Sequence, residues 1–129
     1  MTLTVTPIYA AVLAVFFIAM SFYVIINRAM ADVLVGDGGN RDLLVAIRRH
    51  GNLAEYMPFA IIMMAFGELV GLGALWLHIS GIALIAGRIV HPFGVFADKG
   101  SLAPRVAGVL ATMTAMLIPG VYILYASIT

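Results

Sequence analysis

Apolar residues form four long runs along the chain, separated by short polar or glycine-rich segments. Each run is long enough for a membrane-spanning helix, so the pattern predicts an all-α fold of four antiparallel helices. A polar, glycine-rich stretch at 36–40 and a short turn at 67–73 make the first two connections, and Pro92 stops the third run. The expected helices cover about 7–27, 42–70, 72–91 and 104–126.

The second run carries a polar stripe inside an otherwise apolar helix. Arg48, Asn52 and Glu55 follow one another at spacings of four and three, which places them on one helix face. The uncharged stretch 56–67 that follows has 12 residues, whereas crossing a bilayer core takes about 20. If this helix spans the membrane, Glu55 lies at membrane depth, where a carboxylate costs at least ~2.5 kcal/mol and by default marks a functional site. The alternative is a purely structural ion pair, for example with Arg88.

Composition places the chain in the lipid bilayer. Of its 129 residues, 64% are hydrophobic and 10% are charged, whereas soluble domains have about 25% charged residues. Residues 1–129 are therefore expected to form a single integral membrane domain. The first 27 residues carry no charge and lack the basic start of a secretory signal, so we expect a retained helix. A net charge of +1 gives no support to a nucleic-acid partner, and the absence of cysteine excludes disulfides and a protein thiol nucleophile.

Positive charge is confined to one side of the expected bundle. All seven Lys and Arg residues lie in or beside the loops that follow the first and third runs. With four spans these loops share one membrane face, which the positive-inside rule makes cytoplasmic, and both termini are then periplasmic. The seven residues are Arg28, Arg41, Arg48, Arg49, Arg88, Lys99 and Arg105.

Polar side chains at the cytoplasmic ends of the runs form a candidate binding site. Arginine binds both oxygens of a carboxylate, a buried glutamate can hold an ammonium group, and asparagine both donates and accepts. Such a set is complementary to a zwitterionic ligand with additional carboxylates, such as glutathione. We interpret Arg49, which points about 100° away from Arg48, as a surface charge, and His78 as structural. The candidate residues are Arg28, Arg48, Asn52, Glu55, Tyr56, Arg88, His91 and Arg105.

A family resemblance rests on residues 48–58, whose pattern R-x-x-x-N-x-x-E-Y-x-P resembles the second-helix signature of the MAPEG family. These are the membrane-associated proteins in eicosanoid and glutathione metabolism. Residues 87–91, Gly-Arg-Ile-Val-His, are similar to the family's third-helix segment, and the likeness covers nearly the whole chain. The chain looks like a bacterial-type member, similar to microsomal glutathione transferase and leukotriene C4 synthase.

The resemblance implies a homotrimer in the bacterial inner membrane, with glutathione bound as cosubstrate between subunits. The expected activity is that of a transferase or peroxidase acting on small lipophilic electrophiles that arrive through the bilayer. Arg105 would stabilise the glutathione thiolate, which is the nucleophile. His91 and Val95 stand where many glutathione-using members have tyrosines. The residues implied to bind the peptide are Arg28, Arg48, Asn52, Glu55, Tyr56, Arg88 and His91.

Three other functions fit parts of the pattern. A small transporter would use Glu55 as a proton-exchanging carboxylate, which the neighbouring Arg48 disfavours. A haem-binding anchor would use His50 and His91 as ligands at similar depth. A MAPEG-fold protein without catalytic activity would bind a different ligand at the same place. We expect neither a metal nor a haem.

Overall fold

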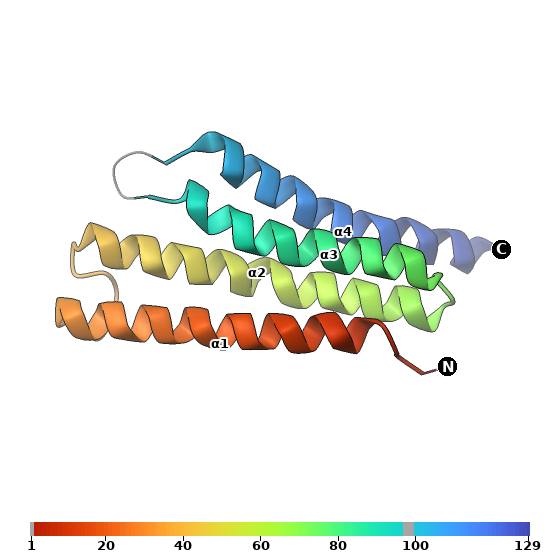
Figure 1. Ribbon diagram of the computed structural model, residues 1–129, viewed down its shortest axis with the longest axis horizontal. Helices are drawn as coiled ribbons and strands as arrows, with labels where there is room; N and C mark the ends of the chain where they lie inside the picture. Colours follow the sequence, from red (N-terminus) through yellow and green to blue (C-terminus); the bar gives the residue numbers. More distant parts are fainter. Residues whose placement is uncertain (1, 97–99) are drawn as a thin grey trace.

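The computed structural model describes residues 2–96 and 100–129. Within those ranges the chain forms α1 (Thr6–Ala31), α2 (Arg41–Leu69), α3 (Ala74–Val90) and α4 (Leu102–Ile128). A short 3₁₀ helix, η1 (His91–Gly94), continues directly from α3. The long helices lie side by side along one axis, and both termini lie at the same end of the bundle (Figure 1). The predicted all-α, antiparallel four-helix fold is confirmed.

Local sequence explains where the helices begin and end. Asn40 is the N-cap of α2, and its side-chain oxygen accepts a hydrogen bond from the backbone N–H of Leu43 at 3.0 Å. The first helix continues to Ala31, past the predicted end at 27, and stops at Asp32, whose φ of 54° is left-handed. Pro92 has no N–H to donate, and the chain changes there from α-helix to η1.

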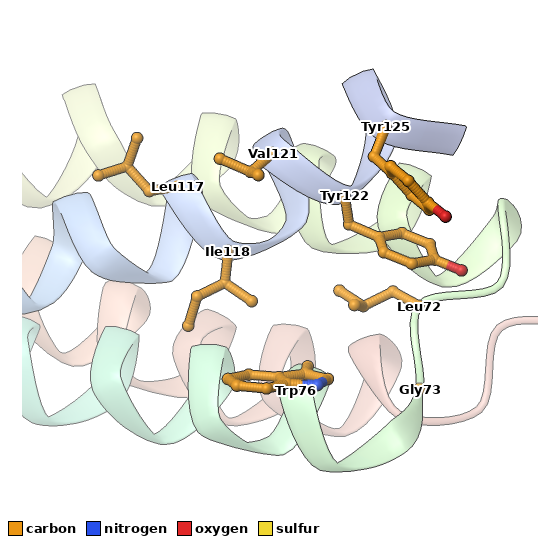
Figure 2. A pocket seen from close by; sticks show the side chains of 8 residues that line it. All are labelled: Leu72, Gly73, Trp76, Leu117, Ile118, Val121, Tyr122 and Tyr125. Atoms are coloured by element: carbon orange, nitrogen blue, oxygen red, sulfur yellow. The ribbon is translucent and has the colours of Figure 1, made fainter. Parts of the chain in front are cut away.

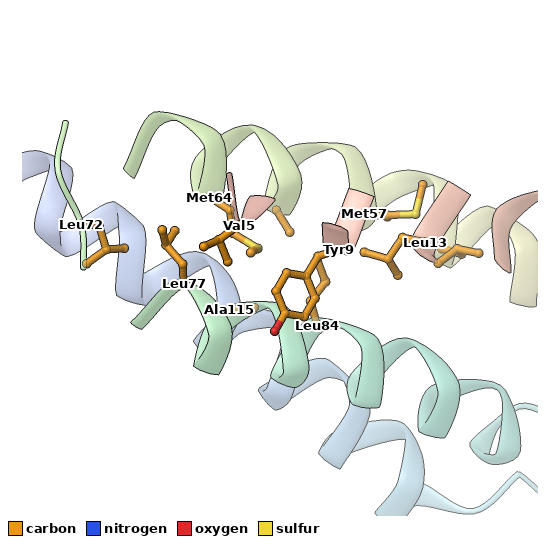
Figure 3. Close-up of a cluster of buried hydrophobic side chains, with 11 residues drawn as sticks. Val5, Tyr9, Leu13, Met57, Met64, Leu72, Leu77, Leu84 and Ala115 are labelled. Atoms are coloured by element: carbon orange, nitrogen blue, oxygen red, sulfur yellow. The ribbon is translucent and has the colours of Figure 1, made fainter. Parts of the chain in front are cut away.

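The bundle is held together by a core of aliphatic side chains contributed by all four helices. Leu13, Met64 and Leu84 are almost completely buried, and Figure 3 shows them in one contiguous cluster with Tyr9 and Met57. Burial of each such side chain contributes about 1.5–3 kcal/mol to helix association in a soluble protein. In lipid, where that driving force between helices is absent, the same contacts act through van der Waals packing.

Glycines allow α3 and α4 to approach each other closely. A Cβ atom on Gly87 would lie 2.7 Å from the carbonyl oxygen of Gly108, and a Cβ on Gly108 would lie 2.7 Å from the Cβ of His91. Small residues at such crossings let helix backbones touch. This crossing fixes the separation of the two helices near their charged ends, where Arg88 and Arg105 are located.

Three of the four helical segments, Thr6–Ala31, Ala74–Gly94 and Leu102–Ile128, are long and apolar enough to cross a membrane. The helix α2 is not among them, because it carries the polar stripe and further charges near both of its ends. It is nevertheless the longest helix, with 29 residues. Large apolar side chains such as Val15 and Leu124, about 70% exposed, cover the outside of the bundle. Such an exposed apolar surface is typical of a protein surrounded by lipid.

Candidate functional site

The centre of the charged end is Arg88, a buried arginine on α3 that is only 2% exposed. Its Nη1 donates to Asn52 Oδ1 at 2.8 Å, and its Nη2 donates to the carbonyl oxygen of Gly108 at 3.2 Å. The guanidinium also lies 5.6 Å from the centre of the Tyr56 ring. The structure therefore brings together three of the predicted site residues, one from α3 and two from α2.

The positive charge of Arg88 is not balanced by a carboxylate within the described residues 2–96 and 100–129. The buried Nε of the same side chain has no hydrogen-bond partner there either. The suggested structural ion pair with Glu55 is wrong, because Asn52 takes the place of the carboxylate. A buried cation that is satisfied only by neutral oxygens carries a desolvation cost that an anionic ligand would offset.

Glu55 and Arg48 lie on the outer face of α2 rather than in the core. The Arg48 Nη1 is 3.9 Å from Glu55 Oε1, and the two side chains are 59% and 54% exposed. The pairing does not favour Glu55 as an isolated, proton-exchanging carboxylate of a transporter. Both side chains are thus accessible at the surface of the isolated subunit.

His91 and Arg105 stand where α3, η1 and α4 meet. The His91 side chain is 5% exposed and packs against α4 at Gly108. A Cβ on Gly94 would lie 2.6 Å from the backbone nitrogen of Arg105, so η1 is in direct contact with the first turns of α4. The Arg105 side chain is exposed on the outer surface of α4, where it lines a shallow groove with Val106.

Among the residues that the structure describes, Arg28 binds the backbone of the loop between α1 and α2 and does not contact Arg88. Its Nη1 donates to the carbonyl oxygens of Gly36 at 2.8 Å and Leu34 at 3.4 Å, which holds the loop between α1 and α2. Within the part of the chain that the structure describes, no hydrogen bond joins Arg28 to Arg88 or its partners. Its predicted contact with a ligand therefore depends on a change of side-chain conformation or on a second subunit.

The sequence interpretation of Arg49 as a surface charge is wrong. Both Nε and Nη2 donate to the carbonyl oxygen of Val95, at 3.0 and 2.6 Å, and Nη1 donates to the Tyr23 hydroxyl at 3.2 Å. The guanidinium also lies 5.0 Å from the centre of the Phe96 ring. Helical spacing correctly separates Arg49 from the stripe, but spacing alone does not reveal what lies on the other side of the helix.

The two histidines considered as haem ligands contact different helices. His50 Nε2 is 3.0 Å from the Ser21 hydroxyl, and the imidazole lies against the Phe17 ring of α1 with centroids 4.8 Å apart. His91 instead packs on α4. In the ranges that the structure describes, no three His, Cys, Asp or Glu side chains gather as a set of metal ligands.

Glu68, at the opposite end of the bundle, is a residue that the sequence analysis did not single out. Its carboxylate accepts hydrogen bonds from the backbone N–H groups of Val5 at 2.7 Å and Thr6 at 2.8 Å, and from the Thr4 hydroxyl at 2.9 Å. The side chain of α2 thereby caps the N-terminus of α1, where a negative charge is favourable. At the same end His78, which we interpreted as structural, has Nδ1 2.8 Å from the Tyr9 hydroxyl.

An open apolar groove of about 790 Å³ lies at this end of the bundle, between the start of α3 and the end of α4. Trp76 faces Ile118 and Tyr122 across it, and no charged side chain lines it (Figure 2). Without charged or convergent polar groups, the groove offers no chemistry for a zwitterionic ligand. The residues that line it are Leu72, Gly73, Trp76, Leu117, Ile118, Val121, Tyr122 and Tyr125.

Comparisons with known proteins identify the family of the chain. The chain is 40% identical over 114 residues to the inner membrane protein YecN of Escherichia coli strain K12, which covers 88% of this chain and 86% of that protein. The protein of the same name from Escherichia coli O6:H1 strain CFT073 matches with the same identity and coverage. No solved structure matches the chain. The MAPEG family model matches residues 6–125, nearly the whole chain, so this membrane protein belongs to the MAPEG family.

Proposed function

We propose that this protein is a glutathione-dependent membrane transferase or peroxidase that acts on lipophilic electrophiles. The observation that carries the proposal is the buried guanidinium of Arg88, held by Asn52 and without a carboxylate partner in residues 2–96 and 100–129. Its partner Asn52 lies on α2 between Arg48 and Glu55 in the sequence, and these two side chains are exposed and 3.9 Å apart. Together these side chains offer cationic sites for carboxylates and one anionic site for an ammonium group.

Glutathione fits this donor and acceptor set. It carries two carboxylates and one ammonium group, and the chain offers Arg88 and Arg48 for the former and Glu55 for the latter. Asn52 donates through its amide N–H₂ while its oxygen is engaged with Arg88. Val95 stands where the resemblance to glutathione-using family members implies a tyrosine, so we assign more of the binding to the guanidinium groups.

We propose that the site is completed by a second copy of the chain in a homotrimer. Arg48 and Glu55 are more than half exposed in the isolated subunit, and Arg105 is exposed on α4. A neighbouring subunit that packs α4 against this face would cover the ion pair and bring a permanent cation to the same pocket. Arg28, Tyr56 and His91 complete the list of residues assigned to the ligand.

Arg105 is the residue assigned to catalysis. Bound glutathione supplies a thiol, and a cation beside a thiol lowers its pKa and raises the fraction present as the nucleophilic thiolate. The guanidinium suits this role because it stays charged at any physiological pH. Arg88 and Asn52 hold the peptide, and the apolar side chains of Val106 and Leu110 line the groove beside Arg105.

The proposed orientation places this site on the cytoplasmic side. In that orientation α2 crosses the membrane in addition to the three apolar segments, so the bundle has four spans. Both termini are then periplasmic, and the helix ends that carry the arginines face the cytoplasm. A helix of 29 residues is about 44 Å long, which is enough to cross a bilayer with its polar stripe below the surface. Lipophilic electrophiles then reach the site laterally from the membrane.

Two substitutions test the proposal in detergent-solubilised protein. Glu55→Ala should weaken glutathione binding in calorimetry by at least about tenfold, because one charge-assisted hydrogen bond contributes about 1.5–3 kcal/mol. Glu55→Gln, which keeps the volume and one hydrogen bond, is the matched control and should lose less. An unchanged dissociation constant in Glu55→Ala would remove this residue from the site.

Arg105→Ala separates catalysis from binding. It should lower the rate of conjugation or peroxide reduction by at least about tenfold while the dissociation constant of glutathione changes less. Arg105→Lys, which keeps the charge, should retain more of the rate. A catalytic rate in Arg105→Ala equal to that of the wild type would exclude the assigned role.

A further inference from the structure

Arg49 connects three parts of the charged end. From α2 it donates to the Tyr23 hydroxyl on α1 and twice to the carbonyl oxygen of Val95, the residue that follows η1. Its guanidinium lies over the ring of Phe96 at 5.0 Å. One side chain thus fixes the backbone immediately after η1 against the first two helices.

The backbone that Arg49 holds is in direct contact with the proposed catalytic arginine. Gly94 precedes Val95, and a Cβ on Gly94 would lie 2.6 Å from the backbone nitrogen of Arg105 and 2.8 Å from the carbonyl oxygen of Ser101. The first turns of α4 therefore rest on η1. A shift of Val95 would be transmitted through Gly94 to the start of α4.

The same segment carries His91, one of the residues assigned to the ligand. His91 opens η1 and packs on Gly108, so its place depends on how η1 lies against α4. Arg49 fixes the far end of η1 while Asn52, one turn further along α2, fixes Arg88 at its near end. Both ends of the segment are thus tied to one helix.

Arginine suits this contact better than lysine does. A guanidinium donates from several N–H groups in a fixed plane and stacks on an aromatic ring, whereas an ammonium group is a flexible point donor. The contact at Arg49 uses three of its nitrogens together with the face of Phe96. Adjacent residues of a helix point about 100° apart, so Arg49 can hold η1 while Arg48 belongs to the ligand-binding face.

We propose that Arg49 is a positioning residue: through Val95 and Gly94 it holds η1 and the start of α4 where His91 and Arg105 serve the site. The inference rests on the proposed function for its catalytic consequence, but its geometric part can be tested without any ligand. Loss of Arg49 should release Val95 from α2 and displace Arg105 at the start of α4, although neither the substrate nor the reacting atoms touch Arg49.

The geometric test uses the absence of cysteine from the chain. A single cysteine introduced by Ser101→Cys gives one spin-label site, at an exposed residue whose side chain makes no capping hydrogen bond. In detergent micelles, Arg49→Ala should increase the mobility of this label, and Arg49→Lys should increase it less. Tyr23→Phe removes a single bond of 3.2 Å and is the matched control with little change. Equal label mobility in Arg49→Ala and the unsubstituted background would overturn the proposal.

The catalytic test uses the same variants without the label. Arg49→Ala should lower kcat by about tenfold with a smaller change in KM for glutathione, and Arg49→Lys should recover part of the rate. The pH at which the rate is half-maximal should rise, because a displaced Arg105 stabilises the thiolate less. An active wild type with unchanged kcat and pH profile in Arg49→Ala would overturn the proposal. An inactive wild type would contradict the proposed function instead, and the label mobility would still decide whether Arg49 positions the segment.

Discussion

The two ends of the bundle differ in how their charged side chains are paired. At the end that holds the termini, the Glu68 carboxylate accepts several hydrogen bonds from the start of α1, so its charge is satisfied within the subunit. At the other end, Arg88 is buried with neutral oxygens as its partners, and Arg48 and Glu55 are exposed. The Glu68 charge stabilises the fold, whereas the buried charge of Arg88, which has only neutral partners, supports the proposed ligand site.

Replacement of Arg88 tests this comparison with the largest expected effect. Arg88→Met keeps the apolar stem and removes the charge, so glutathione affinity should fall by at least about 100-fold, or ~2.7 kcal/mol. Thermal stability in detergent should change by less than about 2 kcal/mol, because relief of the desolvation cost of the buried cation opposes the loss of its hydrogen bonds to Asn52 and Gly108. Calorimetry and thermal unfolding of the same preparation measure both quantities. Retained affinity would show that the unbalanced charge has no ligand.

The second largest effect, on stability, is expected where α3 and α4 cross beneath the site. Gly108→Ala should destabilise the protein by about 1–3 kcal/mol through overpacking, because the new methyl group meets the backbone of Gly87 and the base of His91. Gly120→Ala, on the same helix, meets only the flexible end of Met63 at 3.4 Å and is the matched control. Thermal unfolding should separate the two variants, and equal stabilities would contradict the close approach.

Neutralising Glu68 should change stability and leave ligand binding intact. Glu68→Gln keeps the shape but turns charge-assisted hydrogen bonds into neutral ones, with an expected loss of about 1–2 kcal/mol. Glutathione affinity should stay within about twofold of the wild type, since the residue lies at the opposite end of the bundle. A large loss of glutathione affinity at unchanged stability would contradict the assignment of ligand binding to the opposite end alone.

The smallest effect is expected for the pair of Tyr9 and His78. Tyr9→Phe removes the hydroxyl that lies 2.8 Å from His78 Nδ1 and keeps the ring that packs over Gly81. The expected loss of stability is about 1 kcal/mol, with no change in ligand binding. A thermal unfolding curve that overlays the wild type would show that this hydrogen bond contributes nothing measurable.

Helix periodicity predicts the four-helix plan and the shared face of Arg48 and Glu55, because both follow from contacts close in the sequence. It also brings Asn52 and Tyr56 to one side of α2, although it does not reveal that Asn52 turns towards Arg88. The helix ends are less accessible to prediction, as the extension of α1 to Ala31 shows. The site assignment itself stays a prediction, whereas the family membership is confirmed.

Arg49 and Glu68 could not be assigned from the sequence, because their partners are distant along the chain. Arg49 bonds a carbonyl oxygen that lies 46 residues away, and Glu68 caps backbone groups 62 to 64 residues earlier. Backbone partners leave no trace in side-chain identity, so no motif indicates them. A charged residue inside an apolar helix signals that a partner exists, and only the fold shows whether that partner belongs to the chain.

Calorimetric titration of the detergent-solubilised wild-type protein with glutathione tests the proposed site most directly. The unbalanced charge at Arg88 predicts saturable binding with a dissociation constant below about 1 mM, equivalent to about 4 kcal/mol. A parallel titration with S-methylglutathione, which keeps the charges and lacks the thiol, should also saturate, because the charged groups provide most of the affinity. The absence of saturable heat from either peptide at several times that concentration would contradict a glutathione site at this end of the bundle.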